Sequence, residues 1–147
     1  MLSQLRDVLA YKGATVFSVD VKTRVPDAAR EMTERRIGAL LVTSEGAPVG
    51  IFSERDILQR VVAVDRAPGS ATVAEVMTRR VAVVRGSVTV EEAMAICTEK
   101  RVRHLPVVED GKVVGMVSSG DLARWLSRDR AGEIQQLVDY ISGRYPG

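Results

Sequence analysis

Two segments of the sequence have the residue types and the spacing to bind an anion. They are Gly50-Ile-Phe-Ser-Glu-Arg-Asp56 and Gly115-Met-Val-Ser-Ser-Gly-Asp121, and in each an apolar stretch ends in Gly-x-x-Ser followed by x-x-Asp. A helix that begins here presents free N–H groups and the positive end of its dipole, which suit a phosphate. A carboxylate one turn in can accept hydrogen bonds from two neighbouring hydroxyls, as on a ribose. Together these groups indicate a nucleotide site.

The same residues also fit a purely structural role. Ser-x-x-Asp ahead of an apolar run is a capping box. In it, the Ser side chain accepts a hydrogen bond from a first-turn N–H, and the Asp side chain accepts one from the backbone N–H of the Ser. Such a cap contributes about 1 kcal/mol to stability and needs no ligand. The residues alone leave both interpretations of Ser53, Asp56, Ser118 and Asp121 open.

Both segments belong to an internal duplication. When the chain is shifted by 65 residues, residues 25–56 align without a gap with residues 90–121, and 12 of the 32 positions are identical. Identity at this level in one ungapped alignment indicates two copies of one unit. Because each unit is too small to build a large core of its own, we expect the two copies to pack together.

The residue pattern predicts the same order of elements in each copy: strand, helix, strand, strand, helix. Gly46 and Gly111 predict a hairpin turn between the last two strands, since glycine takes the positive φ that such turns need. The predicted strands are residues 15–19, 39–42 and 49–52, then 81–84, 105–108 and 113–117. The predicted helices are residues 27–36 and 54–64, then 91–101 and 119–127, and residues 67–70 form the linker.

The composition excludes several classes of protein. The 147 residues carry 21 Lys+Arg against 19 Asp+Glu and 4% aromatic residues, which does not favour a nucleic-acid-binding surface. A (β/α)₈ barrel needs roughly 250 residues and is excluded. The single cysteine, Cys97, excludes a disulfide framework and fits a reducing compartment. With no long apolar run and no signal-peptide pattern, we expect a cytoplasmic protein with neither nucleic-acid nor membrane partners.

The duplicated unit resembles the cystathionine-β-synthase (CBS) domain. The resemblance rests on the closing Gly-x-x-Ser-x-x-Asp and on Ile37-Gly-Ala-Leu-Leu-Val42 and Val102-Arg-His-Leu-Pro-Val107, and it covers about residues 8–128. It implies an α+β fold of two tandem β-α-β-β-α repeats, which pack through their sheets about a pseudo-twofold axis and leave two clefts. We assign residues 8–66 and 73–129 to the repeats, and residues 131–147 to a C-terminal helical tail with an amphipathic pattern.

The resemblance also implies a ligand and the residues that hold it. CBS pairs bind adenosyl compounds in their clefts, so we expect an adenine nucleotide, AMP first, with ADP, ATP, NAD(H) and S-adenosylmethionine as alternatives. By the resemblance, Asp56 and Asp121 hold the ribose hydroxyls, and Ser53 and Ser118 lie beside them. The residues expected to border the adenine or to line the clefts are Thr15, Val16, Ile37, Gly38, Ala39, Arg80, Val81, Val102, Arg103 and His104.

The two copies differ where a phosphate is expected. Copy one has Arg55 where copy two has Gly120, and copy two has Arg103-His104 where copy one has Gly38-Ala39. Arg55, Arg103 and Lys12 are the candidates for phosphate contacts, although an exposed first-turn arginine without a ligand is the alternative for Arg55. We therefore expect the two clefts to bind unequally.

No residue pattern indicates covalent catalysis. His104 is the only histidine, and neither a metal-ligand spacing nor a Ser-His-Asp arrangement accompanies it. We predict a non-catalytic, stand-alone, homodimeric sensor that binds an adenine nucleotide and signals to a partner protein. The alternative is an interaction protein with degenerate clefts, whose dimer surface docks on its partner.

Overall fold

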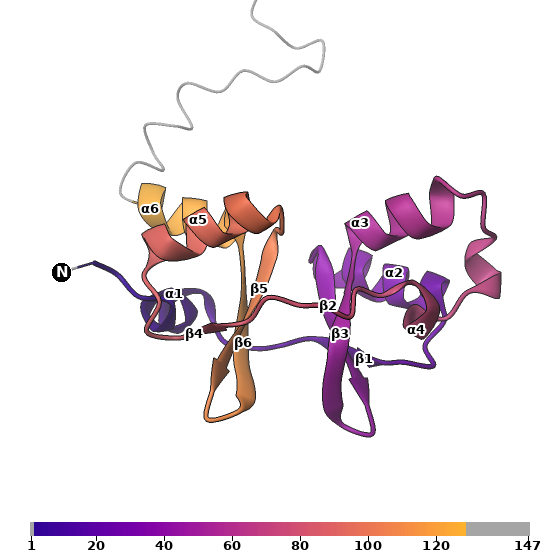
Figure 1. Cartoon of the computed structure of the whole chain (residues 1–147), viewed down its shortest axis with the longest axis horizontal. Coiled ribbons are helices and arrows are strands. Elements are labelled where there is room, and N and C mark those ends of the chain that lie inside the picture. Colours follow the sequence, from indigo (N-terminus) through magenta and orange to yellow (C-terminus); the bar gives the residue numbers. More distant parts are fainter. Residues whose placement is uncertain (1, 129–147) are drawn as a thin grey trace, which may run out of the picture.

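The computed structural model describes residues 2–128, which form two halves of matching architecture (Figure 1). Each half has a three-stranded sheet whose middle strand is parallel to the first strand and antiparallel to the third. This arrangement confirms the predicted α+β fold of two tandem repeats. The first half contains β1 (Ser18–Asp20), α2 (Val25–Arg35), β2 (Ala39–Ser44), β3 (Ala47–Ser53) and α3 (Glu54–Ile57), and the second contains β4 (Val84–Arg85), α5 (Val90–Lys100), β5 (His104–Glu109), β6 (Lys112–Ser118) and α6 (Ser119–Ser127).

The hairpins and the helix ends have the same local causes in both halves. Glu45 and Gly46 have φ of 51° and 82°, and Asp110 and Gly111 have φ of 50° and 75°, as expected of tight hairpin turns. The helices α2 and α5 each end at an arginine in the left-handed conformation, which stops the helix and turns the chain into the central strand. This turn sets the positions of the residues that begin β2 and β5.

The core of each half contains a helix that precedes the other half in the sequence. Helix α1 (Leu5–Lys12) buries Leu5, Val8 and Leu9 in the core of the second half, next to β5, β6, α5 and α6. Helix α4 (Val73–Val76), which follows the short 3₁₀ turn η2 (Pro68–Ser70), packs in the core of the first half. Figure 1 shows the two chain segments that lead from these helices crossing between the halves. The sequence analysis predicted neither α1 nor α4.

The two sheets face one another between the helical layers. Along β2, Leu40 and Val42 point into the core of their own half, while Ala39 and Leu41 point the other way. The latter pair forms an inter-sheet cluster with buried Ile51, against which partly buried side chains of both halves pack: Val16, Val81, Val113 and Met116. Packing through the sheets is thus as the fold prediction describes.

Three predicted elements differ from the structure by more than two residues at one end. In place of the predicted strands 15–19 and 81–84, the structure has Ser18–Asp20 and Val84–Arg85, and residues before these strands line cavities between the halves. The predicted helix 54–64 is one α-helical turn, α3, continued by the π-helical turn η1 (Leu58–Val62). The predicted tail helix lies outside the described residues. Within residues 2–128, no helix is long and apolar enough to cross a membrane.

Candidate functional site

Two cavities lie between the halves, and each combines parts of both. They are lined by what we call the lead segments, residues 12–17 and 77–82, which precede the first strands and are equivalent under the 65-residue shift. The first cavity, of about 350 Å³, joins Ser53–Arg55 to the second lead segment, and the second, of about 450 Å³, joins Ser118 and Asp121 to the first lead segment. Both volumes fall within the roughly 300–1,000 Å³ typical of small-ligand sites.

Each motif glycine on the third strand is packed closely against chain from before the other half: Gly50 against the second lead segment and Gly115 against helix α1. A Cβ on Gly50 would lie 2.6 Å from the Thr78 carbonyl oxygen, and a Cβ on Gly115 would lie 2.6 Å from Cδ2 of Leu9. No larger residue fits either position unless the neighbouring chain moves. The glycine of each Gly-x-x-Ser motif is therefore required by the close packing of the segment that comes from before the other half.

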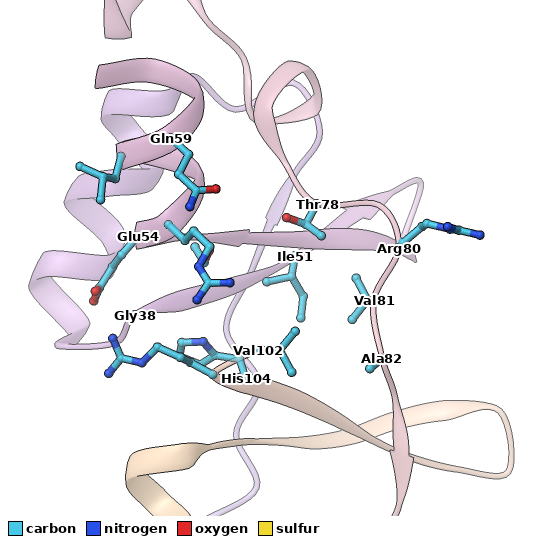
Figure 2. A pocket seen from close by; sticks show the side chains of 14 residues that line it. Gly38, Ile51, Glu54, Gln59, Thr78, Arg80, Val81, Ala82, Val102 and His104 are labelled. Atoms are coloured by element: carbon cyan, nitrogen blue, oxygen red, sulfur yellow. The ribbon is translucent and has the colours of Figure 1, made fainter. Parts of the chain in front are cut away.

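In the first cavity, whose lining side chains are drawn in Figure 2, the motif carboxylate is not part of the lining. Asp56 is 3% exposed and is not among the cavity-lining residues. Its Oδ2 accepts hydrogen bonds from Ser53 N at 2.9 Å and Ser53 Oγ at 3.3 Å, and its Oδ1 accepts one from Thr78 Oγ1 at 2.8 Å. Here the capping interpretation of the motif describes the observed contacts.

Three arginines, Arg55, Arg80 and Arg103, line the first cavity, and the first two are directed elsewhere in this structure. Arg55 lines the cavity, but its Nη1 donates to the carbonyl oxygen of Arg101 in the other half at 2.6 Å. The Arg80 side chain extends away from the other labelled residues (Figure 2). Beside them, Glu54 contributes a carboxylate to the lining.

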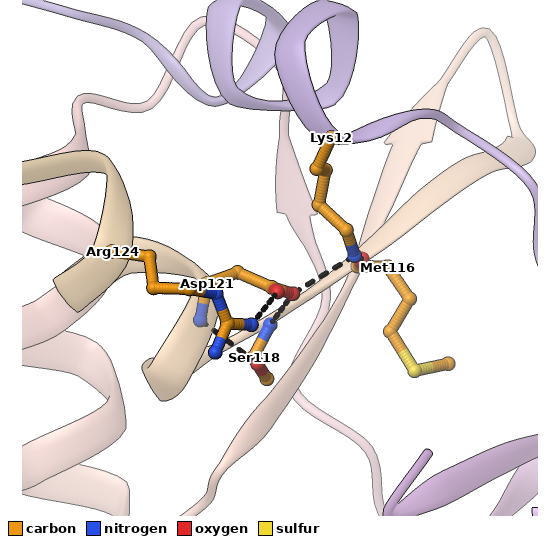
Figure 3. A network of polar contacts seen from close by, with 5 residues as sticks. All are labelled: Lys12, Met116, Ser118, Asp121 and Arg124. Carbon is orange, nitrogen blue, oxygen red and sulfur yellow. Dashed lines mark hydrogen bonds and ion pairs between the residues drawn. The ribbon is translucent and has the colours of Figure 1, made fainter. Parts of the chain in front are cut away.

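In the second cavity, the motif carboxylate is part of the lining and is surrounded by cations (Figure 3). Asp121 Oδ2 accepts a hydrogen bond from Ser118 N at 2.8 Å and another from Lys12 Nζ at 2.8 Å, and Oδ1 accepts one from Arg124 Nη2 at 2.7 Å. Ser118 Oγ accepts a bond from Asp121 N at 3.0 Å, which completes a capping box. Lys12 Nζ also donates to the Met116 carbonyl oxygen at 2.7 Å.

These contacts decide the charge of Asp121. Burial on its own raises the pKa of the carboxyl, but the hydrogen bonds and charge of Lys12 and the hydrogen bonds of Ser118 outweigh it. The net result is a pKa below the ordinary 3.8, so Asp121 is ionised at neutral pH. An ionised carboxylate is the form that accepts hydrogen bonds from a ribose.

His104 and Gly38 line both cavities and mark the place where they meet. Burial lowers the pKa of His104 below 6.5, Arg103 and Lys12 lower it further, and Glu54 and Asp121 act in the opposite direction. The imidazole is therefore neutral at pH 7. Gly38 leaves room for it, since a Cβ there would lie 3.3 Å from Cε1 of His104.

Of the residues that the sequence analysis expected in the clefts, all except Asp56 line one cavity or the other. Those at the first are Ser53, Arg55, Arg80, Val81, Val102 and Arg103, those at the second are Lys12, Thr15, Val16, Ile37, Ala39, Ser118 and Asp121, and Gly38 and His104 line both. The sequence analysis missed Thr78, Arg36 and Arg124. Comparison of the lead segments does not single out Thr78, because five of their six equivalent positions differ.

Comparisons with known proteins agree with this architecture. A family model described as "CBS domain" matches residues 6–63 and 73–128. The chain is 37% identical over 126 residues to the CBS domain-containing protein CBSX3, mitochondrial, of Arabidopsis thaliana, which aligns 82% of this chain with 61% of that protein. It is 30% identical over 132 residues to the CBS domain-containing protein YhcV of Bacillus subtilis, covering 89% of this chain and 91% of that protein.

The same architecture is found in solved structures. A candidate signal-transduction protein with CBS domains from Burkholderia ambifaria matches with a TM-score of 0.84 at 38% sequence identity. The match covers 87% of this chain and 96% of that chain. Nearly all of the described residues are therefore accounted for by one known architecture.

Proposed function

The chain belongs to the CBS domain family as a tandem pair, and from this premise we propose that it is a non-catalytic regulatory sensor. It binds an adenine nucleotide between its two halves and signals to a partner protein. The observation that carries the proposal is the second cavity, where an ionised Asp121 and the cations Lys12 and Arg124 line one space. A carboxylate for hydroxyls and nearby cations for phosphates are the two features that a nucleotide requires.

The ligand we propose is a phosphorylated adenosine, with AMP as the first candidate and ADP, ATP and NAD(H) next. Lys12, Arg36 and Arg124 give the second cavity three cations against the single carboxylate of Asp121. This excess favours an anionic phosphate and disfavours the sulfonium of S-adenosylmethionine. The apolar side chains of Val16 and Phe17 at the same cavity offer contacts for a base.

The alternative function, an interaction protein with degenerate clefts, has one observation in its favour. Asp56 is buried and hydrogen-bonded through both oxygens, so the first motif performs a structural role here. If both clefts were degenerate, no nucleotide would stabilise the fold. A single experiment therefore separates the two functions.

That experiment is a thermal unfolding series with AMP, ADP, ATP, NAD⁺, NADH and S-adenosylmethionine, each at about 1 mM. A ligand with a Kd of about 10 μM stabilises the folded state by about 2.7 kcal/mol, a shift of several degrees for a chain of this size. The sensor predicts a shift with at least one phosphorylated adenosine. The absence of any shift, in protein shown to be folded and free of co-purified nucleotide, would favour the interaction protein.

We further propose that a second copy of the chain covers the exposed face of η1. Leu58, Val62 and Val64 are 61%, 58% and 61% exposed, and the positions equivalent to Leu58 and Val62 hold Ala123 and Ser127 in the second half. Such a local apolar surface is typical of an interface. Sedimentation velocity should show a dimer that Val62→Asp dissociates, and a monomeric wild type at micromolar concentration would contradict this.

A further inference from the structure

The two lead segments take equivalent places at the two cavities, but their residues differ at five of the six positions, and two neighbouring differences affect the motif aspartates. Thr78 of the second lead segment is equivalent to Gly13 of the first, and Met77 is equivalent to Lys12. One residue of each lead segment contacts the motif aspartate: Thr78 contacts Asp56, and Lys12 contacts Asp121. The consequences for Asp56 and Asp121 are opposite.

At the first cavity, Thr78 fastens the lead segment to the motif. Its hydroxyl donates to Asp56 Oδ1 at 2.8 Å, and its backbone exchanges two hydrogen bonds with Ile51, at 2.8 and 2.9 Å. Arg60 strengthens the attachment, because its Nη1 donates to the carbonyl oxygens of Val76 and Met77. We call these contacts the Thr78 lock. With Asp56 3% exposed inside it, neither carboxylate oxygen faces the cavity.

At the second cavity, the equivalent lock is missing among the described residues. Gly13 has no side chain to reach Asp121, and no backbone bridge links it to Met116, the equivalent of Ile51. The contacts to the Asp121 side chain from outside its own motif come instead from the flexible ends of Lys12 and Arg124, whose side chains are 31% and 74% exposed. Long side chains of this kind can turn toward a bound anion without any change in the backbone.

We infer that the cleft at Asp121 alone binds the nucleotide, while Asp56 and Thr78 form a structural lock that closes the first cleft to a ribose. The inference rests on the proposed function and assigns it to one of two equivalent motifs. Lys12 becomes the residue that determines which ligands are accepted, because its ammonium group can pass from Asp121 to a phosphate while the carboxylate receives the ribose hydroxyls.

The test is isothermal titration calorimetry with AMP and ATP as probes, on the full chain and three variants, each also measured for thermal stability. The wild type should bind one nucleotide per chain. Asp121→Asn, which retains a good helix cap, should weaken binding about tenfold or more through loss of a charge-assisted hydrogen bond. The matched variants Asp56→Asn and Thr78→Ala should lower the unfolding temperature and leave the affinity within about twofold.

Each result bears on the inference. Two nucleotides per chain, or a loss of affinity in Asp56→Asn or Thr78→Ala as large as in Asp121→Asn, would overturn the assignment to one cleft. An unchanged affinity in Asp121→Asn would overturn it as well. Failure of the wild type to bind either probe would instead refute the proposed function, and the inference with it.

Discussion

Lys12→Met tests the second cleft by giving it the residue that the first half has at the equivalent position, Met77. Lys12 Nζ lies 2.8 Å from Asp121 Oδ2 and 2.7 Å from the Met116 carbonyl oxygen, and the paired side chains are only 31% and 13% exposed. A hydrogen bond to a charged group contributes about 1.5–3 kcal/mol. Because Asp121 keeps its bonds from Arg124 and Ser118, we expect the variant to lose about 1–2 kcal/mol of unfolding free energy at pH 7.

The loss should depend on pH in a defined direction. Since the pKa of Asp121 is lower in the folded protein than the ordinary 3.8, the stabilisation is fully present at pH values above the unfolded pKa and is lost as the pH falls through the folded one. Urea unfolding at pH 7, 5, 4 and 3 should therefore give a constant difference between wild type and Lys12→Met down to about pH 4 and a smaller one below.

Arg30→Met is the matched control for this measurement. Arg30 pairs with Asp27 at 2.7 Å, but the two side chains are 69% and 65% exposed, so the variant should lose about 0.5 kcal/mol or less. Equal losses in Lys12→Met and Arg30→Met would show that the Lys12 contacts are no stronger than a surface pair. A loss that stays the same at pH 3 would show that Asp121 is not the partner responsible.

Two further predictions concern Gly50, which packs against the second lead segment, and His104, which lines both cavities. Gly50→Ala places a Cβ 2.6 Å from the Thr78 carbonyl oxygen and should lower the free energy of urea unfolding by about 1–3 kcal/mol. Gly69→Ala is the control, since no atom lies within 4 Å of its Cβ, and it should leave that free energy unchanged. Similar losses in both variants would contradict the close-packing argument. Burial lowers the pKa of His104 in the folded protein, so the stability that neutral His104 contributes is complete above pH 6.5 and should decrease as the pH drops toward 5. The unfolding free energy of His104→Asn should lack this decrease. Parallel curves of unfolding free energy against pH for the wild type and the variant would refute the prediction.

The sequence predicted the parts of the fold that depend on near neighbours. The hairpins follow from Gly46 and Gly111, whose positive φ the turns require, and the central helices and strands follow from apolar spacing. Because of the 65-residue repeat, each element could be predicted from two copies of the pattern. The predicted ends of α2 and α5 differ from the observed ends by only one or two residues. The roles of the motif residues as ribose ligands remain predictions.

The features that escaped prediction depend on contacts between distant residues. Helix α4 has only four residues and a capping box at Thr72, too little to identify it without the core of the first half into which it packs. Helix α1 is similarly fixed by the second half. The Asp56–Thr78 hydrogen bond spans 22 residues and exists because the second lead segment returns to β3. No local sequence pattern indicates that the second lead segment packs against β3.

The exchange of lead segments gives the two copies of one motif different surroundings, although both motifs keep the same Gly, Ser and Asp. Each cavity takes its Gly-x-x-Ser-x-x-Asp from one half and its facing wall from the segment before the other half. Of the two cavities, Lys12 and Gly13 line only the second and Thr78 lines only the first. Each motif aspartate accepts a hydrogen bond from the backbone N–H of its N-cap serine, whatever the lead segment opposite it. An intact motif is therefore fully accounted for by a helix cap, and in the proposed assignment it is the lead segment opposite the motif that decides whether a nucleotide binds.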